Sequence, residues 1–197
     1  IKNSISRLHQ WIEANHVVYG VNTGYGGTGV FNKHLDAEHT ADLQEVLING
    51  LLAGAHQDCL PTSVVRASLL VRVVSNFVGV SGLRLEVMQR IVRLLNEDMI
   101  PVVPLKGSLS ASGDLVPLAY MVAALLPQQD PLVEVIAKGR RMPARQALDE
   151  IGMEPLRLAP KEALAMVNGT SVGAGAAGSV AVQSLNAYIL ANVLTEF

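Results

Sequence analysis

Residues 163–195 contain no Asp, Glu, Lys or Arg, and no other feature of the sequence constrains the fold as strongly. The stretch is longer than the ~20 residues that a membrane-spanning helix needs. Its amide side chains, however, include Gln183, Asn186 and Asn192, and amides are costly in lipid. We therefore predict no membrane span but a helix buried on all sides, inside the chain itself or inside an oligomer.

The composition excludes several classes of protein. Half of the 197 residues are hydrophobic and only 16% are charged, which is too apolar for a disordered chain. The formal net charge of −2 predicts no attraction to nucleic acid. The single cysteine, Cys59, rules out an internal disulfide and is typical of a reducing compartment, so we expect a cytoplasmic protein. The opening residues, IKNSISRLHQ, do not predict a signal peptide.

Apolar residues recur at helical spacing along most of the chain. The predicted helices cover residues 1–15, 36–56, 62–78, 84–96 and 115–126, and a further helix begins near residue 160. Prolines keep residues 99–110 extended. The polar, proline-containing segment 127–160 predicts a surface excursion. Strands and helices do not alternate regularly, so we expect a mainly α chain with at most small strands.

Among the arginines on the predicted helices are Arg66, Arg72 and Arg84. A cation that is removed from water is costly unless a partner compensates its charge. We therefore expect all three to be ion-paired, inside the chain or at an interface, rather than catalytic.

Two patterns of binding sites are incomplete. The run GYGGTG at 24–29 matches the dinucleotide-binding glycines, and Glu45 lies near the distance of a ribose-binding acid. No helix opens inside these glycines and no βαβ unit surrounds them, so a mobile loop is the better interpretation. His34 and His39 are five residues apart, and the zinc-binding H-E-x-x-H motif is absent from the sequence. We expect neither a nucleotide nor a metal.

Three of the smallest residues, Ala111, Ser112 and Gly113, stand together before an apolar run. One interpretation is a helix start, with Ser112 or Asp114 as the cap. The other is a reaction. The nitrogen of Gly113 attacks the carbonyl carbon of Ala111, a five-membered ring forms with loss of water, and Ser112 loses its hydroxyl group as a second water. Glycine fits the attacking position because a Cβ would crowd the nitrogen, and Asp114 would hold the loop or move protons.

Three longer motifs favour the reaction. They are YGVNTGYGG, GSLSASGDLVPLAY and KEALAMVNGTSVGAG, which begin at residues 19, 107 and 161. In this order they resemble the aromatic amino acid ammonia-lyases and aminomutases that carry a methylidene-imidazolone (MIO) group, most of all the phenylalanine ammonia-lyases. The resemblance covers residues 16–197. It implies a mainly α fold, in which a loop-rich MIO-bearing domain leads into a long central helical bundle.

The resemblance also implies roles for single residues. The MIO group forms from residues 111–113, and no metal or nucleotide takes part. Tyr19 is the catalytic base on a mobile loop, and it removes a β-proton before ammonia and an α,β-unsaturated acid leave. Asn168 contacts the electrophile or the substrate, and Leu115 lies beside the substrate pocket. Helix N-termini that point at the site would favour the phenolate of the tyrosine.

In this family a pair of residues on the helix after the tyrosine loop goes with the substrate. The segment LQEVLINGLLAG places this pair at Gly50 and Leu51. Leu51 fits an aromatic ring and argues against histidine, whereas Gly50 matches none of the family's pairs and leaves room for a larger aryl group. We expect conversion of L-phenylalanine to trans-cinnamate and ammonia, as in phenylpropanoid metabolism. Tyrosine as substrate, an aromatic 2,3-aminomutase and a non-catalytic scaffold stay open as alternatives.

The resemblance divides the chain near residue 160. Residues 1–160 form the MIO-bearing domain with the tyrosine loop, and residues 161–197 begin the central bundle. Family members continue well beyond the VNGT helix, and the later segments supply further site residues, partly from neighbouring subunits. We therefore expect a homotetramer with shared active sites, a chain that is inactive without its partners, and no nucleic acid or membrane as a partner.

Overall fold

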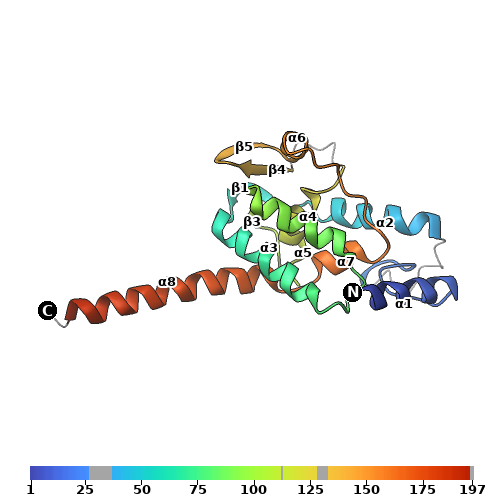
Figure 1. Cartoon of the computed structure of the whole chain (residues 1–197), viewed down its shortest axis with the longest axis horizontal. Helices are drawn as coiled ribbons and strands as arrows, with labels where there is room; N and C mark the ends of the chain where they lie inside the picture. Colours follow the sequence, from blue (N-terminus) through green and yellow to red (C-terminus); the bar gives the residue numbers. More distant parts are fainter. Residues whose placement is uncertain (27–36, 112, 128–132, 196–197) are drawn as a thin grey trace.

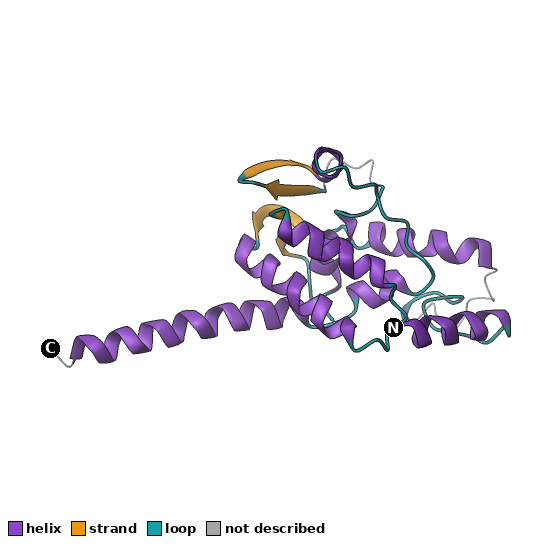
Figure 2. Cartoon of the chain, in the orientation of Figure 1, coloured by secondary structure: helices purple, strands orange, loops and turns teal. Residues whose placement is uncertain are grey.

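The computed structural model describes residues 1–26, 37–111, 113–127 and 133–195, and helices form most of it (Figures 1 and 2). The helices are α1 (Lys2–Glu13), α2 (Ala37–Gly50), α3 (Thr62–Phe77), α4 (Leu85–Asn96), α5 (Leu115–Ala123), α6 (Ala144–Glu150), α7 (Glu162–Val167) and α8 (Ser171–Thr195). The strands are β1 (Ala55–Cys59), β2 (Met99–Pro101), β3 (Pro104–Lys106), β4 (Glu134–Ala137) and β5 (Arg140–Pro143). The mainly α fold predicted from the periodicity is confirmed.

Helix α5 lies in the middle of the hydrophobic core. Its residues from Pro117 to Ala123 are all buried, as expected for a helix that is apolar on every side. Helices α2 and α7 contact α5 directly, and α3 packs against α4 through buried side chains such as Leu69 and Met88. The core therefore fixes the start of α5, which directly follows residues 111–113.

Two small antiparallel sheets complete the body. One pairs β1 with β3, and the other has the order β2-β4-β5, with Ile100 opposite Ile136 and Val135 opposite Met142. The second sheet shows that the surface excursion predicted for 127–160 is wrong. Val135, Met142 and Leu148 are buried in the main core. The prediction failed because polar residues outnumber the few apolar residues that these short elements turn inward.

Helix α8 begins against α3 and then leaves the body of the protein as a single rod (Figure 1). The two helices approach closely where a Cβ on Gly175 would lie 2.7 Å from the backbone nitrogen of Ser68. Beyond this contact α8 exposes a series of large apolar side chains, which are Val180, Val182, Leu185, Tyr188, Ile189, Leu190, Val193 and Leu194. Within a single chain the burial predicted for this stretch is therefore wrong, except in the first turns of α8.

By length and composition alone, the stretch Glu162–Thr195 qualifies as a candidate membrane span, at a mean hydropathy of 1.2. The break between α7 and α8 falls inside it, at residues 168–170. The candidate active site lies at this break.

Candidate active site

Tyr19 and Asn168 line the same cavity, although 149 positions separate them in the sequence (168 − 19). The cavity has a volume of about 410 Å³. Its lining consists of Tyr19, Arg72, Val80, Ser81, Lys161, Leu164, Ala165 and Asn168. Two of these side chains are cations and none is an acid, so the cavity favours an anionic or electron-rich ligand.

Tyr19 stands in a tight turn that its own neighbours hold. The Val21 N–H donates to the carbonyl oxygen of Val18 at 3.0 Å, and the Asn22 side chain accepts the Val18 N–H at 2.8 Å. The Tyr19 hydroxyl group accepts the Gly26 N–H at 2.7 Å. The side chain of Tyr19 is 49% exposed, so its hydroxyl group combines a fixed hydrogen bond with access to the cavity.

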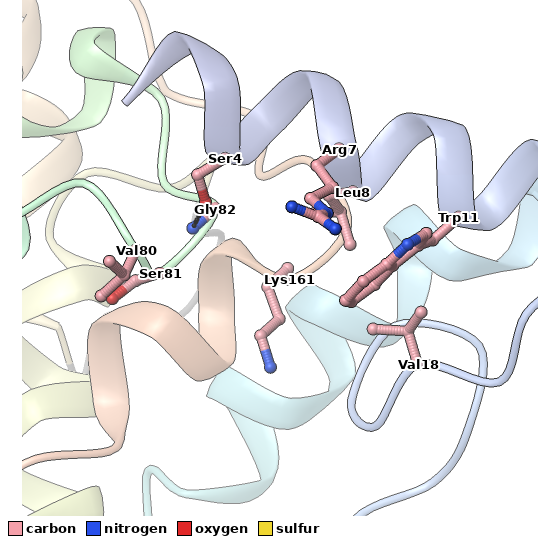
Figure 3. A pocket seen from close by; sticks show the side chains of 9 residues that line it. All are labelled: Ser4, Arg7, Leu8, Trp11, Val18, Val80, Ser81, Gly82 and Lys161. Atoms are coloured by element: carbon pink, nitrogen blue, oxygen red, sulfur yellow. Dashed lines mark hydrogen bonds between the residues drawn. The ribbon is translucent and has the colours of Figure 1, made fainter.

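Lys161 holds the backbone of Tyr19 from the other side. It precedes α7 in a left-handed conformation with φ +83°, and its Nζ donates to the carbonyl oxygen of Tyr19 at 3.3 Å. The side chain also lines a second cavity of about 260 Å³ beside α1, where its ammonium group points away from Arg7 and Trp11 (Figure 3). Burial lowers the pKa of Lys161.

Gln44 joins the tyrosine turn to two helices. It is fully buried on α2, and its Nε2 donates to the carbonyl oxygen of Gly20 and to the hydroxyl group of Tyr25, both at 3.4 Å. Its Oε1 accepts the Ala163 N–H of α7 at 3.1 Å. A buried amide with these partners fixes the distance between the turn and α7. The sequence motifs gave no indication of this role.

Gly113 lies against the segment that follows Asn168. It is buried, with φ +132°, and a Cβ at this position would lie 2.6 Å from the nitrogen of Gly169. The Asp114 N–H donates to the carbonyl oxygen of Gly169 at 2.7 Å. Only glycine meets both the positive φ and the close approach. The third residue of the predicted ring is thus held at the break between α7 and α8.

The other two residues of the predicted ring differ in how far the structure describes them. Ala111 is exposed, and Ser112 lies outside the described residues. The constrained glycine backbone at Gly113 fits the ring-forming interpretation, because its position admits no Cβ. His34 and the glycines at 27 and 29 also lie outside the described residues. Within the described part, no group of three or more His, Cys, Asp or Glu could hold a metal ion.

Asp114 caps a helix other than its own. Its Oδ2 accepts the N–H groups of Val172 and Gly173 at 3.0 and 3.1 Å, and its Oδ1 accepts the Ser110 hydroxyl at 2.7 Å. Helix α5, which starts at Leu115, receives no side-chain cap from Asp114. The helix-start interpretation of Asp114, as a side-chain cap of the helix after it, is therefore not supported. The carboxylate instead satisfies the N-terminus of α8, where the helix dipole stabilises a negative charge.

The arginines follow the ion-pair prediction in two of three cases. Arg66 pairs with Asp98, and the Nε of Arg84 lies 2.7 Å from the buried carboxylate of Glu162. The hydrogen bond to Glu162 raises the pKa of Arg84. For Arg72, none of the described acidic residues pairs with it inside the chain, so pairing at an interface stays a prediction.

Arg72 belongs to the cavity instead. Its guanidinium group donates to the carbonyl oxygens of Ala165 and Asn168, the latter at 3.0 Å. The side chain is only 7% exposed, and burial lowers its pKa. The sequence contained one signal for this position: Arg72 falls on the face of α3 that buries Val65 and Leu69, where a charged residue is unexpected.

The predicted substrate-binding residues lie outside this cavity. Gly50 is the last residue of α2, is exposed, and would place a Cβ with nothing within 4 Å. Leu51 and Leu115 are half-buried and pack against the core. None of the three lines the cavity of Tyr19. The structure thus brings together the predicted base, the predicted asparagine and the predicted ring glycine, but not the predicted selectivity pair.

Known proteins with similar sequences are ammonia-lyases. A phenylalanine ammonia-lyase from Aspergillus lentulus is 36% identical over 99% of this chain and 29% of its own length. A histidine ammonia-lyase from Streptococcus sanguinis is 42% identical over 83% of this chain and 31% of its own length. The chain thus spans less than a third of the length of these relatives.

Solved structures show the same fold. The phenylalanine aminomutase of Pantoea agglomerans superimposes with a TM-score of 0.79 at 32% identity, over 88% of this chain and 32% of its own. The ergothionase of Treponema denticola gives a TM-score of 0.79 at 26% identity, over 87% and 33% of the two chains. The family profile described as aromatic amino acid lyase matches residues 1–196. The chain therefore belongs to the aromatic amino acid lyase family.

Proposed function

We propose that the protein containing this chain deaminates an aromatic L-amino acid without oxidation, and that L-phenylalanine, converted to trans-cinnamate and ammonia, is its substrate. One observation carries the proposal. Tyr19 and Asn168 line one cavity, and the residue after Asn168 meets the backbone of Gly113. A base, an amide and the ring-forming loop therefore converge at the break between α7 and α8.

The residues of this chain divide the work. The MIO group, formed from residues 111–113, would supply the electrophile that makes the substrate amine a better leaving group. Tyr19 takes the β-proton, and the turn around it and Lys161 keep its hydroxyl group in place. Asn168 offers an amide to the reacting atoms. The cation Arg72 makes the cavity favourable for the substrate carboxylate, whereas Lys161 acts on the placement of Tyr19.

The choice of phenylalanine rests on Gly50, Leu51 and the segment LVPLAY. Both residues lie outside the cavity of Tyr19, so the choice requires that they face the substrate in the assembled protein. There Leu51 would supply an apolar side chain, and the open space at Gly50 would admit a large aryl group. The relatives include both phenylalanine and histidine ammonia-lyases, and the structural neighbours include aminomutases. A tyrosine ammonia-lyase or an aromatic 2,3-aminomutase is thus the second candidate, and a non-catalytic scaffold is the third.

The proposal includes a cytoplasmic homotetramer with shared active sites. The apolar side chains along α8, from Val180 to Leu194, support an assembly because water would otherwise cover them. The family resemblance adds that segments beyond this chain complete each site. We therefore expect residues 1–197 alone to be inactive.

The test uses the whole natural chain and three substrates: L-phenylalanine, L-tyrosine and L-histidine. We expect an arylacrylate to accumulate fastest from phenylalanine, and Tyr19→Phe to lower kcat by about 10²–10⁴-fold, as for loss of a general base. Chromatography of the products separates the alternatives, since a β-amino acid identifies a mutase. Preferred turnover of histidine would overturn the choice of substrate, and no turnover of any of the three would favour the scaffold.

A further inference from the structure

Arg72 is a buried cation without a counter-ion among the described residues. It is 93% buried (100 − 7), and its Nε–H has no hydrogen-bond partner in the described part of the chain. Both described hydrogen bonds of its side chain go to carbonyl oxygens at the end of α7, those of Ala165 and Asn168. Burial of an unpaired charge is costly. A leucine or methionine at this place would fill the core at a lower cost, so packing alone does not explain the arginine.

The guanidinium group lies directly under Gly169. A Cβ on Gly169 would lie 2.1 Å from the Nη1 of Arg72, so any other residue would push the arginine away. Gly169 also contacts Gly113, where a Cβ would lie 2.6 Å from the Gly169 nitrogen. Gly169 therefore contacts both Arg72 and Gly113.

We propose that Arg72 is a positioning residue for ring formation: it holds Gly169 against Gly113 and so fixes the backbone whose nitrogen attacks Ala111. This inference rests on the proposed MIO chemistry and adds a residue to it. The reaction releases two waters and needs no other reactant. The two backbone atoms must approach each other closely, and a Gly169 that is fixed against Gly113 favours this approach.

The same contacts tie ring formation to helix packing. Arg72 belongs to α3, the helix on which α8 begins. One turn earlier, Ser68 contacts Gly175 of α8. Helix α3 therefore contacts the chain on both sides of the break at residues 168–170, through Arg72 before it and Ser68 after it. Because α3 is packed into the body of the protein, we expect Gly169 to stay in contact with Gly113 while residues 111–113 form the ring.

The test compares Arg72→Lys with Arg66→Lys in the whole natural chain. Arg66 lies on the same helix but is exposed, and it bonds Leu95 and Asp98. The readout is the mass of the peptide over residues 111–113, followed over time after refolding. We expect Arg72→Lys to lose the two waters about tenfold more slowly or worse, since a shift of about 1 Å can cost on the order of a hundredfold. Arg66→Lys should match the wild type.

A second variant approaches the contact from the other side. Gly169→Ala forces the guanidinium group away, and we expect the same slow loss of water. Circular dichroism and gel filtration report folding for every variant. A folded Arg72→Lys or Gly169→Ala that closes the ring at the wild-type rate would overturn the proposal. Ring formation lost only in variants that also unfold would overturn it too, because Arg72 would then serve the fold.

A failure of the role proposed for Arg72 can be distinguished from a failure of the proposed deamination. A wild-type chain that forms the ring but deaminates no amino acid refutes the function and leaves Arg72 testable. A wild-type chain that deaminates phenylalanine, with Arg72→Lys maturing at full rate, refutes only the role of Arg72. A wild-type chain without the ring refutes the chemistry on which both rest.

Discussion

Asp114 accepts the backbone N–H of Val172 at 3.0 Å, across 58 positions of the sequence. The carboxylate of Asp114, which directly follows residues 111–113, thus caps the N-terminus of the long helix α8. Loop and helix hold each other, and a change on one side is expected to alter both the stability of the helix and the chemistry of the loop.

Asp114→Ala tests this coupling. The loss of a side-chain cap costs about 0.5–2 kcal/mol, and we expect a fall of this size in the free energy of unfolding. Loss of water from residues 111–113 should slow in the same variant, because Ser110 and α8 no longer hold the loop. Chemical denaturation and peptide mass measure the two effects.

The matched control is Asp58→Ala, since Asp58 is exposed and its ion pair with Lys106 spans 3.5 Å between two exposed side chains. It should change the stability by about 0.5 kcal/mol at most. Equal effects of the two alanines would contradict a special role for Asp114.

Lys161→Met is expected to change how stability depends on pH. Burial lowers the pKa of Lys161 in the folded chain from its ordinary value of 10.5. Between these two pKa values the unfolded chain binds more protons than the folded chain, so stability from this group rises with pH across that window. The rise should be absent in Lys161→Met. Denaturation at a series of alkaline pH values gives the two slopes, and parallel curves would exclude the effect.

The same variant should lower kcat more than it changes KM. Lys161 touches the backbone of Tyr19 rather than its hydroxyl group, so its loss disturbs the placement of the base. Lys138→Met, at an exposed turn with φ +49°, is the control. A rise in KM at constant kcat would place the role of Lys161 in substrate binding instead.

Glu162→Gln should destabilise the fold by about 3 kcal/mol, the lower end of the cost of breaking a buried ion pair. The carboxylate is fully buried and accepts the Nε of Arg84 at 2.7 Å and the Ala159 N–H at 2.7 Å. A glutamine would turn an NH₂ group toward one of these donors. Glu86→Gln removes an exposed partner of the same arginine and should cost about 0.5 kcal/mol or less. Chemical denaturation of the two variants measures the free energies of unfolding that this prediction compares.

Gly50→Phe tests the predicted selectivity position. The space around Gly50 is open, so the fold should change in stability by about 1 kcal/mol or less. If Gly50 faces the aryl ring in the assembled enzyme, kcat/KM for tyrosine relative to phenylalanine should fall by about tenfold, the scale of one clash in an apolar pocket. Val46→Phe, exposed on the same helix, should leave the ratio unchanged. An unchanged ratio in Gly50→Phe would remove Gly50 from the substrate site.

Local periodicity was sufficient to predict the helices but not their surroundings. Helices α3, α4 and α5 lie within the predicted ranges because their apolar residues recur at helical spacing. Strand β4 escaped prediction because Glu134–Ala137 is too short to show alternation among polar neighbours. The exposure of α8 was not predicted either, since a sequence without charges does not indicate which chain covers it.

The site divides in the same way. Tyr19, Gly113 and Asn168 could be predicted because each belongs to a motif of adjacent residues. Arg72 and Gln44 could not, because their partners lie 96 and 119 positions away. Contacts over such distances leave no local pattern in one sequence. The cap that Asp114 forms on α8 was not predicted for the same reason.

The contacts that hold Gly113 have a consequence for protein synthesis. Among the described residues these close contacts come from Asn168 and Gly169, so a nascent chain still lacks them when Gly113 leaves the ribosome. At about 5–20 residues per second, translation needs several further seconds to supply them. These contacts with Gly113 therefore form only after Asn168 and Gly169 have been synthesised. A closed ring is a covalent modification, so its presence shows that residues distant in the sequence came together when that molecule folded.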